Sequence, residues 1–182
     1  MTRIVGGSAG GRRLSAPPGR TTRPTSDRTR EGLFSALEAR YGSLAGRSFL
    51  DLFAGSGAVG LEAASRGAMV VLVERDPRAI TALRANVAEL ALPGVSVRPD
   101  AVERFLETSD RFAFDVCFLD PPYADPVTRA LELLVANEWL GADPTVVVER
   151  ASRDPAPSWP DGLVGHRSRR YGDSTLWYGR RS

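Results

Sequence analysis

DLFAGSGAVG, residues 51–60, joins an apolar strand expected over 49–53 to an alanine-rich helix expected from about 58 to 66. Three glycines in this stretch have the G-x-G-x-x-G spacing, namely Gly55, Gly57 and Gly60. Glycine lets a backbone approach a ligand closely, and an acid that ends the following strand, here Glu74, accepts hydrogen bonds from ribose hydroxyls. The glycine spacing alone is a weak signal. Together with the strand, the helix and the distal acid, it predicts a site for an adenosine-bearing cofactor.

Strands and helices alternate on both sides of this stretch. A helix is expected from Ser26 and Asp27, which suit its N-cap and first turn, to Tyr41. Further strands are expected over 69–73, 95–98, 114–119 and 145–148, with helices over 76–90, 101–108 and 125–139 and a final hairpin of 164–171 and 174–179. Near-continuous apolar strands joined by helices indicate a parallel sheet covered on both faces. The predicted fold class is a doubly wound α/β domain, which we place at residues 26–182.

Charge is distributed unevenly along the 182 residues, whose net charge is only +2. Residues 1–30 carry seven arginines and one aspartate, net +6, residues 31–150 carry net −7, and residues 151–182 carry net +3. Basic ends around an acidic middle are expected if the ends bind a polyanion.

The first 20 residues have the pattern of two short strands around a glycine-rich turn, Gly6–Gly11. Two short strands alone are marginal in water. We therefore expect this hairpin to stand off the core and to become ordered on a partner, with a disordered basic tail as the alternative. Residues 1–25 are the predicted N-terminal arm.

The residue counts bear on several classes of protein. With a single cysteine, Cys117, and a single histidine, His166, no internal disulfide and no Cys/His metal cluster is expected. No apolar run approaches the ~20 residues that span a bilayer, and no signal-peptide core is recognisable, so we expect a cytoplasmic protein without a membrane partner. No exposed apolar stripe stands out, which favours a monomer. His166 is assigned no role.

Asp51 indicates which cofactor the glycine loop takes. A dinucleotide needs phosphate contacts at the helix N-terminus, whereas a carboxylate before the loop suits a cationic ligand end. S-adenosylmethionine has a free ammonium and a sulfonium, and is the predicted cofactor. The alternative for Asp51 is a structural acid that caps loop amides. Asp100, after the strand at 95–98, has two interpretations that can hold together: an acceptor for the adenine amine, or a helix N-cap.

The second candidate site is FLDPPY, residues 118–123. The two prolines lack an N–H and end the strand. That leaves the Asp120 carboxylate and the carbonyl groups around Pro121 as acceptors, beside Tyr123 as a flat stacking surface. Such a pocket suits a planar base with an exocyclic amine. A β-to-loop turn with a capping acid is the alternative for the motif, and core packing is the alternative for Tyr123.

With these motifs in place, the chain resembles the class I S-adenosylmethionine-dependent methyltransferases. Within them it looks like the bacterial 16S ribosomal RNA guanine-N2 methyltransferase D family. The resemblance rests on RIVGG (3–7), GRRL (11–14), RPTSDR (23–28), DLFAGSG (51–57), GLEA (60–63), SRGA (65–68), VER (73–75), DPPY (120–123) and YGDSTL (171–176). Asp-Pro-Pro-Tyr is shared with other amino-methyltransferases, including adenine-N6 DNA enzymes. RPTSDR (23–28) and YGDSTL (171–176), on either side of it in the chain, are much more specific.

The resemblance implies a seven-stranded sheet with an antiparallel last strand, and methyl transfer to the N2 amine of a guanine in small-subunit rRNA. The residues expected to bind the cofactor are Asp51, Gly55, Gly57, Glu74, Arg75, Asp100, Ala101 and Asp120. Those expected to hold and activate the base are Asp120, Pro121, Pro122 and Tyr123. The candidate RNA contacts are Arg3, Arg12, Arg13, Arg20, Arg23, Arg28, Arg169 and Arg170. For the last two, a solvated strand face is an equal alternative.

Other functions remain open from the sequence. An adenine-N6 DNA methyltransferase fits the tetrapeptide, but 182 residues leave little room for an added recognition domain. A non-catalytic RNA-binding module would have a vestigial cofactor site, and an NAD-dependent oxidoreductase lacks an acid/base residue for hydride chemistry. We also expect Trp139, Trp159 and Trp177 to be core or rim residues, and removal of residues 1–20 to weaken RNA binding while leaving cofactor affinity unchanged.

Overall fold

The computed structural model describes residues 2–17, 26–108, 112–122 and 127–182. Its helices are α1 Asp27–Tyr41, α2 Ala58–Ser65, α3 Pro77–Leu90, α4 Val102–Leu106 and α5 Val127–Ala136. Its strands are β1 Thr2–Arg3, β2 Arg13–Leu14, β3 Ser48–Leu52, β4 Met69–Glu74, β5 Val95–Pro99, β6 Phe114–Leu119, β7 Leu140–Ala151, β8 Leu163–Tyr171 and β9 Ser174–Arg181. Every strand predicted from the sequence after residue 48 is present, and the strand predicted at 145–148 is longer than expected.

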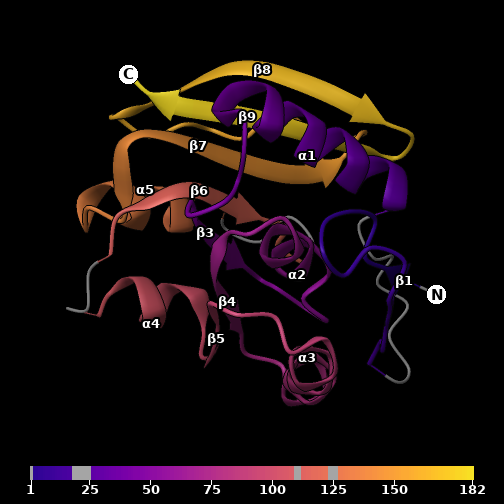
Figure 1. Cartoon of the computed structure of the whole chain (residues 1–182). Coiled ribbons are helices and arrows are strands. Elements are labelled where there is room, and N and C mark those ends of the chain that lie inside the picture. Colours follow the sequence, from indigo (N-terminus) through magenta and orange to yellow (C-terminus); the bar gives the residue numbers. More distant parts are fainter. Residues whose placement is uncertain (1, 18–25, 109–111, 123–126) are drawn as a thin grey trace.

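Seven strands form one sheet in the order β5-β4-β3-β6-β7-β9-β8 (Figure 1). The first five of these pair in parallel, while β9 lies antiparallel between β7 and β8. The chain runs outward from β3 to β5 and then crosses to β6 on the other side of β3. Ligands of open α/β sheets bind at such a switch point, beyond the carboxyl ends of the strands. The predicted seven-stranded α/β fold with an antiparallel last strand is therefore confirmed.

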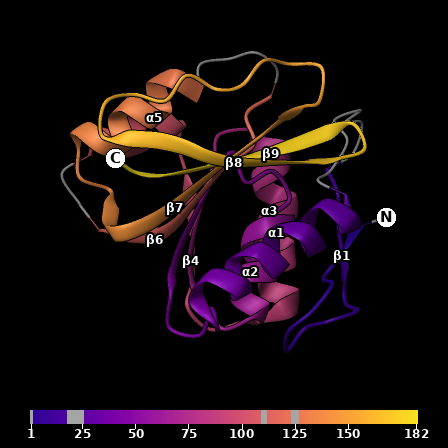
Figure 2. The same cartoon turned by 90° about the horizontal axis from the view of Figure 1, so that it is seen from above.

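Alternate residues of the strands supply two separate hydrophobic cores. On one face, Phe49, Val116 and Phe118 pack with α1, α2 and α3. On the other face, Leu50 and Cys117 pack with α4 and α5. Figure 2, seen from above, shows α1, α2 and α3 on one side of the sheet and α5 on the other. Neighbouring side chains of a strand point to opposite faces, so the apolar runs in the sequence are buried on both sides.

Helix ends follow the capping chemistry expected from the sequence. The Ser26 side chain accepts a hydrogen bond from the Thr29 amide and begins α1. Asp76 accepts from the amides of Arg78 and Ala79, and Pro77 occupies the first turn of α3. Both caps satisfy amides that have no partner within the helix. These predicted helix starts are confirmed.

The N-terminal arm does not stand off the core, so that expectation is wrong for residues 2–17. Ile4 and Leu14 are buried in the same core as α2. Glu62 of α2, with no exposed surface, accepts hydrogen bonds from the amides of Val5 and Gly6 at 2.6 and 2.8 Å. A two-stranded ribbon gains stability by packing against a helix, and here the buried carboxylate supplies acceptors for the amides of its turn.

None of the described helices combines the length and the apolarity needed to span a bilayer. Within the same residues, no group of three or more acidic, cysteine or histidine side chains is arranged to hold a metal ion. Burial raises the pKa of the Cys117 thiol above its ordinary value, because the thiolate would have no solvation there.

Candidate active site

A cavity of about 860 Å³ opens beyond the carboxyl ends of β3, β4, β6 and β7. We call it the carboxyl-edge cavity. Its walls include Asp51, Phe53 to Ser56, Glu74, Arg75, Asp100, Asp120 to Pro122, Glu149 to Arg153, Arg170, Asp173 and Ser174. The sequence motifs at 51–60 and 118–123 therefore face one space, large enough for a drug-sized ligand.

The glycines of the loop after β3 have different surroundings. Gly55 has a φ of +58°, and a side chain there would point into open space. Gly57 has a φ of +86°, and a Cβ there would lie 2.4 Å from Leu83 of α3. Gly60 lies against β4, where a Cβ would approach Leu72 to 2.1 Å. Gly55 thus lines the carboxyl-edge cavity, while the other two glycines allow close packing of α2.

Asp51 is 2% exposed, and the structure supports its capping role while placing it at the cavity. Its Oδ2 accepts a hydrogen bond from the Gly60 amide at 2.8 Å, so it caps the first turn of α2. The same side chain lines the carboxyl-edge cavity. Burial raises the pKa of Asp51 to about 7; the Gly60 hydrogen bond opposes this shift, and the negative charge of Glu74 adds to it. A cation in the cavity would favour the ionised form.

Glu74 joins the glycine loop to the loop after β4. Its Oε2 accepts from the Gly55 amide at 2.7 Å, and its Oε1 accepts from the amides of Arg75 and Asp76, both at 2.8 Å. The residue is 7% exposed and lines the carboxyl-edge cavity. Three amides therefore fix the orientation of a carboxylate beside the site predicted to hold a ribose. Arg75 also lines the cavity and is exposed.

Asp100 lies at the end of β5 and lines the carboxyl-edge cavity. Its Oδ1 accepts from the amide of the next residue, Ala101, at 2.8 Å. The N-cap of α4 is Ala101, with no side-chain cap, so the N-cap interpretation of Asp100 is wrong. The helix starts one residue later than that interpretation required. Ala101 is not among the residues that line the cavity.

The end of β6 brings the proline motif beside the glycine loop. Leu52 of β3 is the register partner of Leu119 of β6, so the loop after β3 starts next to Asp120. Asp120, Pro121 and Pro122 line the carboxyl-edge cavity. Tyr123 lies outside the described residues, so its predicted stacking role stays a prediction.

A third wall was missed from the sequence. Val148 of β7 pairs with Leu119, which places Glu149 beside Asp120 at the same edge. Glu149 is 7% exposed, and Arg150, Arg153 and the β8–β9 turn continue this wall. An apolar strand followed at once by Glu149-Arg150 was the available signal. The sequence pattern did not show that β7 lies next to β6, so Glu149 could not be placed beside Asp120.

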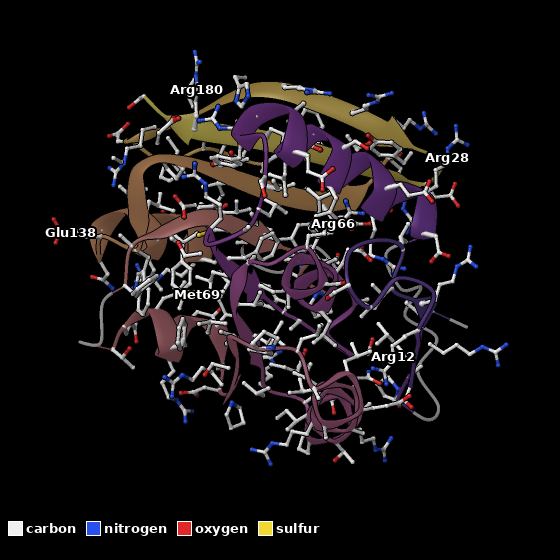
Figure 3. All side chains as sticks on the ribbon, viewed as in Figure 1. Arg12, Arg28, Arg66, Met69, Glu138 and Arg180 are labelled. Carbon is white, nitrogen blue, oxygen red and sulfur yellow. The ribbon has the colours of Figure 1, made fainter. Side chains whose placement is uncertain are left out.

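The predicted RNA contacts that the structure describes are all exposed arginines, namely Arg3, Arg12, Arg13, Arg28, Arg169 and Arg170. Figure 3 shows Arg12 and Arg28 on the side of the molecule where the N-terminal arm lies. Arg12 donates to the Glu89 carbonyl at 2.7 Å, and Arg3 pairs with Asp27 at 3.3 Å. Arg20 and Arg23 lie outside the described residues.

Arginines of β8 lie over aromatic rings. The Arg167 guanidinium is 5.5 Å from the Tyr178 ring centre, and Arg169 is 5.6 Å from that of Tyr171. Partial burial, together with Arg180, Arg40 and Arg167 nearby, lowers the pKa of His166. The edge strand β8 thus carries three exposed arginines, Arg167, Arg169 and Arg170.

Trp139 is buried and donates to the Leu106 carbonyl, as expected for a core residue, and Trp159 and Trp177 pack against the same core.

Curated relatives of this chain are named as methyltransferases or methylases. The family model "Conserved hypothetical protein 95" matches residues 2–180. The Bacillus subtilis "Putative rRNA methyltransferase YlbH" is 36% identical over 93% of this chain and 94% of its own length. The Escherichia coli "Ribosomal RNA small subunit methyltransferase D" is 34% identical over 92% of this chain and 83% of its own length.

Solved structures share the fold over nearly the whole chain. The "Putative methyltransferase yhhF from Escherichia coli" superimposes with a TM-score of 0.87 at 31% identity, covering 99% of this chain and 97% of its own. A T. thermophilus 16S rRNA N2 methyltransferase, in complex with AdoMet and guanosine, shares the fold at 22% identity, with a TM-score of 0.67 over 91% of this chain and 46% of its own. Because a family model matches almost all of it and relatives above 30% identity cover more than nine-tenths of it, the chain belongs to the ribosomal RNA small subunit methyltransferase D family.

Proposed function

We propose that this protein transfers a methyl group from S-adenosylmethionine to the N2 amine of a guanine in small-subunit rRNA. The observation that carries the proposal is the shared cavity: the glycine loop after β3 and the proline motif after β6 line the same space. Their strands are adjacent and in parallel register. A ligand on the first and a base on the second would therefore meet. The names of the relatives supply rRNA as the substrate class.

The residues at the carboxyl-edge cavity fit the proposed cofactor. Asp51 offers a buried carboxylate to its ammonium group, and Glu74 offers an oriented carboxylate to its ribose. Gly55 leaves open space above the backbone, and Asp100 lies at the next strand end for the adenine amine. The acidic lining suits a cationic ligand better than a pyrophosphate. A related fold carries AdoMet, which supports the same choice.

The base would be held by the end of β6. A guanine amine is a poor nucleophile, because its lone pair is delocalised into the ring. When Asp120 and the Pro121 carbonyl accept its two N–H groups, the nitrogen moves toward tetrahedral geometry and its lone pair is aimed along the cavity. The Asp120 carboxylate also stabilises the positive charge that develops on that nitrogen. Bound S-adenosylmethionine would supply a methyl group on sulfur and would leave as S-adenosylhomocysteine. The methylated nitrogen would release one proton to solvent by way of the Asp120 carboxylate that accepts its N–H.

The target base must leave its stack to reach this depth, and Tyr123 is our candidate for stacking it. Exposed arginines of the N-terminal arm, of the start of α1 and of β8 would bind the flanking phosphates. We propose that the enzyme acts in the cytoplasm as a monomer. Met69 and Phe112 are exposed apolar side chains that a second copy of the chain could cover. Light scattering, which measures the mass in solution, therefore tests whether the protein is a monomer.

One experiment separates this proposal from its competitors. The enzyme is incubated with a radiolabelled methyl donor and three unmethylated substrates: free small-subunit rRNA, assembled small subunits and duplex DNA. Label on guanine N2 of either RNA substrate is expected. Label in DNA alone would favour an adenine-N6 enzyme, and calorimetry that detects no S-adenosylmethionine binding would favour a non-catalytic RNA-binding module.

A further inference from the structure

Asn86 of α3 is a polar side chain that sequence reasoning did not single out. It is 1% exposed, so each of its hydrogen-bonding groups needs a partner within the protein. Its Oδ1 accepts from the Ser15 amide at 2.8 Å, and its Nδ2 donates to the Ser15 carbonyl at 3.0 Å. The same Nδ2 donates to the Ser56 carbonyl at 2.9 Å. One side chain thus joins the N-terminal arm to the glycine loop.

The two segments that Asn86 joins both face the carboxyl-edge cavity. Ser56 lines it directly, and so do Ala16 and Pro17, which follow Ser15 in the chain. Ser15 itself is exposed, and the two Asn86 hydrogen bonds are the contacts that hold its backbone against α3. Closer to the N-terminus, Glu62 and Ser65 of α2 bind the arm through the amides of its turn. The arm is therefore anchored at two places, and the second lies at the cavity.

We infer that residues 15–17 of the N-terminal arm form a wall of the cofactor site and that Asn86 is the positioning residue that holds them there. The inference rests on the proposed function, because the ligand of the cavity is taken to be S-adenosylmethionine. It replaces our expectation that loss of the arm leaves cofactor affinity unchanged.

The effect of losing Asn86 follows from the three hydrogen bonds. Without them the Ser15 amide and the Ser56 carbonyl lose their partners, and residues 15–17 are free to leave the cavity. A ligand must then order this segment when it binds, which weakens binding. We expect the dissociation constant to rise about tenfold, equivalent to about 1.4 kcal/mol.

The test measures calorimetric binding of S-adenosylhomocysteine, the reaction product, to full-length variants well below their melting temperatures. Asn86→Ala removes the side chain. Ser15→Pro removes the amide that donates to Asn86 and also fixes the φ of this exposed residue. It reaches the same link if Asn86→Ala fails to fold. The controls are Ser15→Ala, which keeps that amide, and Asn137→Ala, which removes a side-chain bond to the Leu106 carbonyl on the far core.

Asn86→Ala and Ser15→Pro should each raise the dissociation constant about tenfold. Because both act on the same link, the dissociation constant of the double variant should be about that of the weaker-binding single variant. The two controls should stay within twofold of wild type. If Asn86→Ala lowers the melting temperature but leaves the dissociation constant unchanged, Asn86 is merely structural and the inference is wrong. A wild-type protein that binds no S-adenosylhomocysteine would instead overturn the proposed function, and the inference with it.

Discussion

The floor of the carboxyl-edge cavity and the exposed arginines of the surface, which we call the rim, differ in charge and in burial. On the floor, Asp51 and Glu74 are buried carboxylates held by backbone amides. The rim consists of exposed arginines, of which Arg170 lines the cavity and Arg12 and Arg28 do not. Oriented buried carboxylates suit a small cationic ligand in one fixed pose, whereas exposed arginines suit a polyanion whose attraction depends on salt. The comparison predicts that floor substitutions alter chemistry and cofactor affinity, and rim substitutions alter nucleic-acid affinity.

The largest effect is expected where the floor meets the base. Asp120→Ala should lower kcat for methyl transfer by about 100- to 1000-fold, the usual cost of losing one group that stabilises transition-state charge. Cofactor affinity should change only a few-fold, because that ligand is held mainly by β3 and β4. Single-turnover transfer to rRNA, with calorimetry on the same samples, measures both.

A matched control for this substitution is Asp143→Ala, since Asp143 is an exposed acid paired with Arg40 on the surface. It should retain wild-type kcat. Near-normal transfer by a folded Asp120→Ala variant would remove Asp120 from the mechanism.

The two glycines of the cofactor loop should separate packing from ligand contact. Gly57→Ala places a Cβ near Leu83 in a left-handed conformation, so we expect the free energy of unfolding to fall by about 2–4 kcal/mol. Gly55→Ala adds only the conformational strain, about 1–2 kcal/mol, and places a methyl group in open space on a residue that lines the cavity. Urea unfolding and S-adenosylhomocysteine calorimetry measure the two quantities. Equal loss of cofactor affinity in both variants, at matched stability, would contradict this division.

The raised pKa of Asp51 gives the floor a pH dependence. In the ligand-free protein this carboxyl has a pKa of about 7, above its ordinary 3.8, so it binds a proton that the unfolded chain releases between about pH 4 and 7. Its contribution to stability is therefore lost as the pH rises through that window. A ligand ammonium prefers the carboxylate, so cofactor affinity should rise about tenfold from pH 6 to 8.

Calorimetry across that pH range measures the affinity, and Asp51→Asn is the control. The variant cannot ionise at this position, so its affinity should be lower and nearly independent of pH. The same pH profile in both proteins would mean that another group is responsible.

The smallest effect is expected on the rim. Replacing Arg12 and Arg13 with alanine should weaken rRNA binding several-fold and reduce its salt dependence by up to about two phosphate contacts. Binding isotherms at several salt concentrations measure both. Arg129→Ala is the control, because Arg129 lies on α5 and pairs with Glu107 and Glu132. If Arg129→Ala weakens rRNA binding as much as the double substitution of Arg12 and Arg13 does, the N-terminal arm has no special role in binding.

Local pattern was enough to predict much of the fold. The apolar run at 114–119 and the Asp76-Pro77 start of α3 match the structure residue for residue. The cavity residues Asp51, Glu74, Asp100 and Asp120 were also identified beforehand. Glu74, Asp100 and Asp120 end or follow a predicted strand, Asp51 comes just before the glycine loop, and the carboxyl ends of parallel strands meet at one edge.

Other features depend on pairs of residues that are distant in the sequence. Asn86 and Ser15 are 71 positions apart, and Glu62 and Val5 are 57 apart. No local sequence pattern near either partner indicates these contacts. For that reason the sequence wrongly predicted that the N-terminal arm stands off the core. The different roles of the loop glycines likewise depend on which helix or strand packs against each one.

By itself, the sequence determined the alternation of strands and helices and the types of side chain at the strand ends, because hydrophobic period and turn chemistry are local properties. Only the tertiary structure decided that Glu149 lies beside Asp120, that β9 lies between β7 and β8, and that the arm closes one side of the carboxyl-edge cavity. Those arrangements come from burial and hydrogen bonding between segments far apart in the chain, and local sequence does not encode them in a readable pattern.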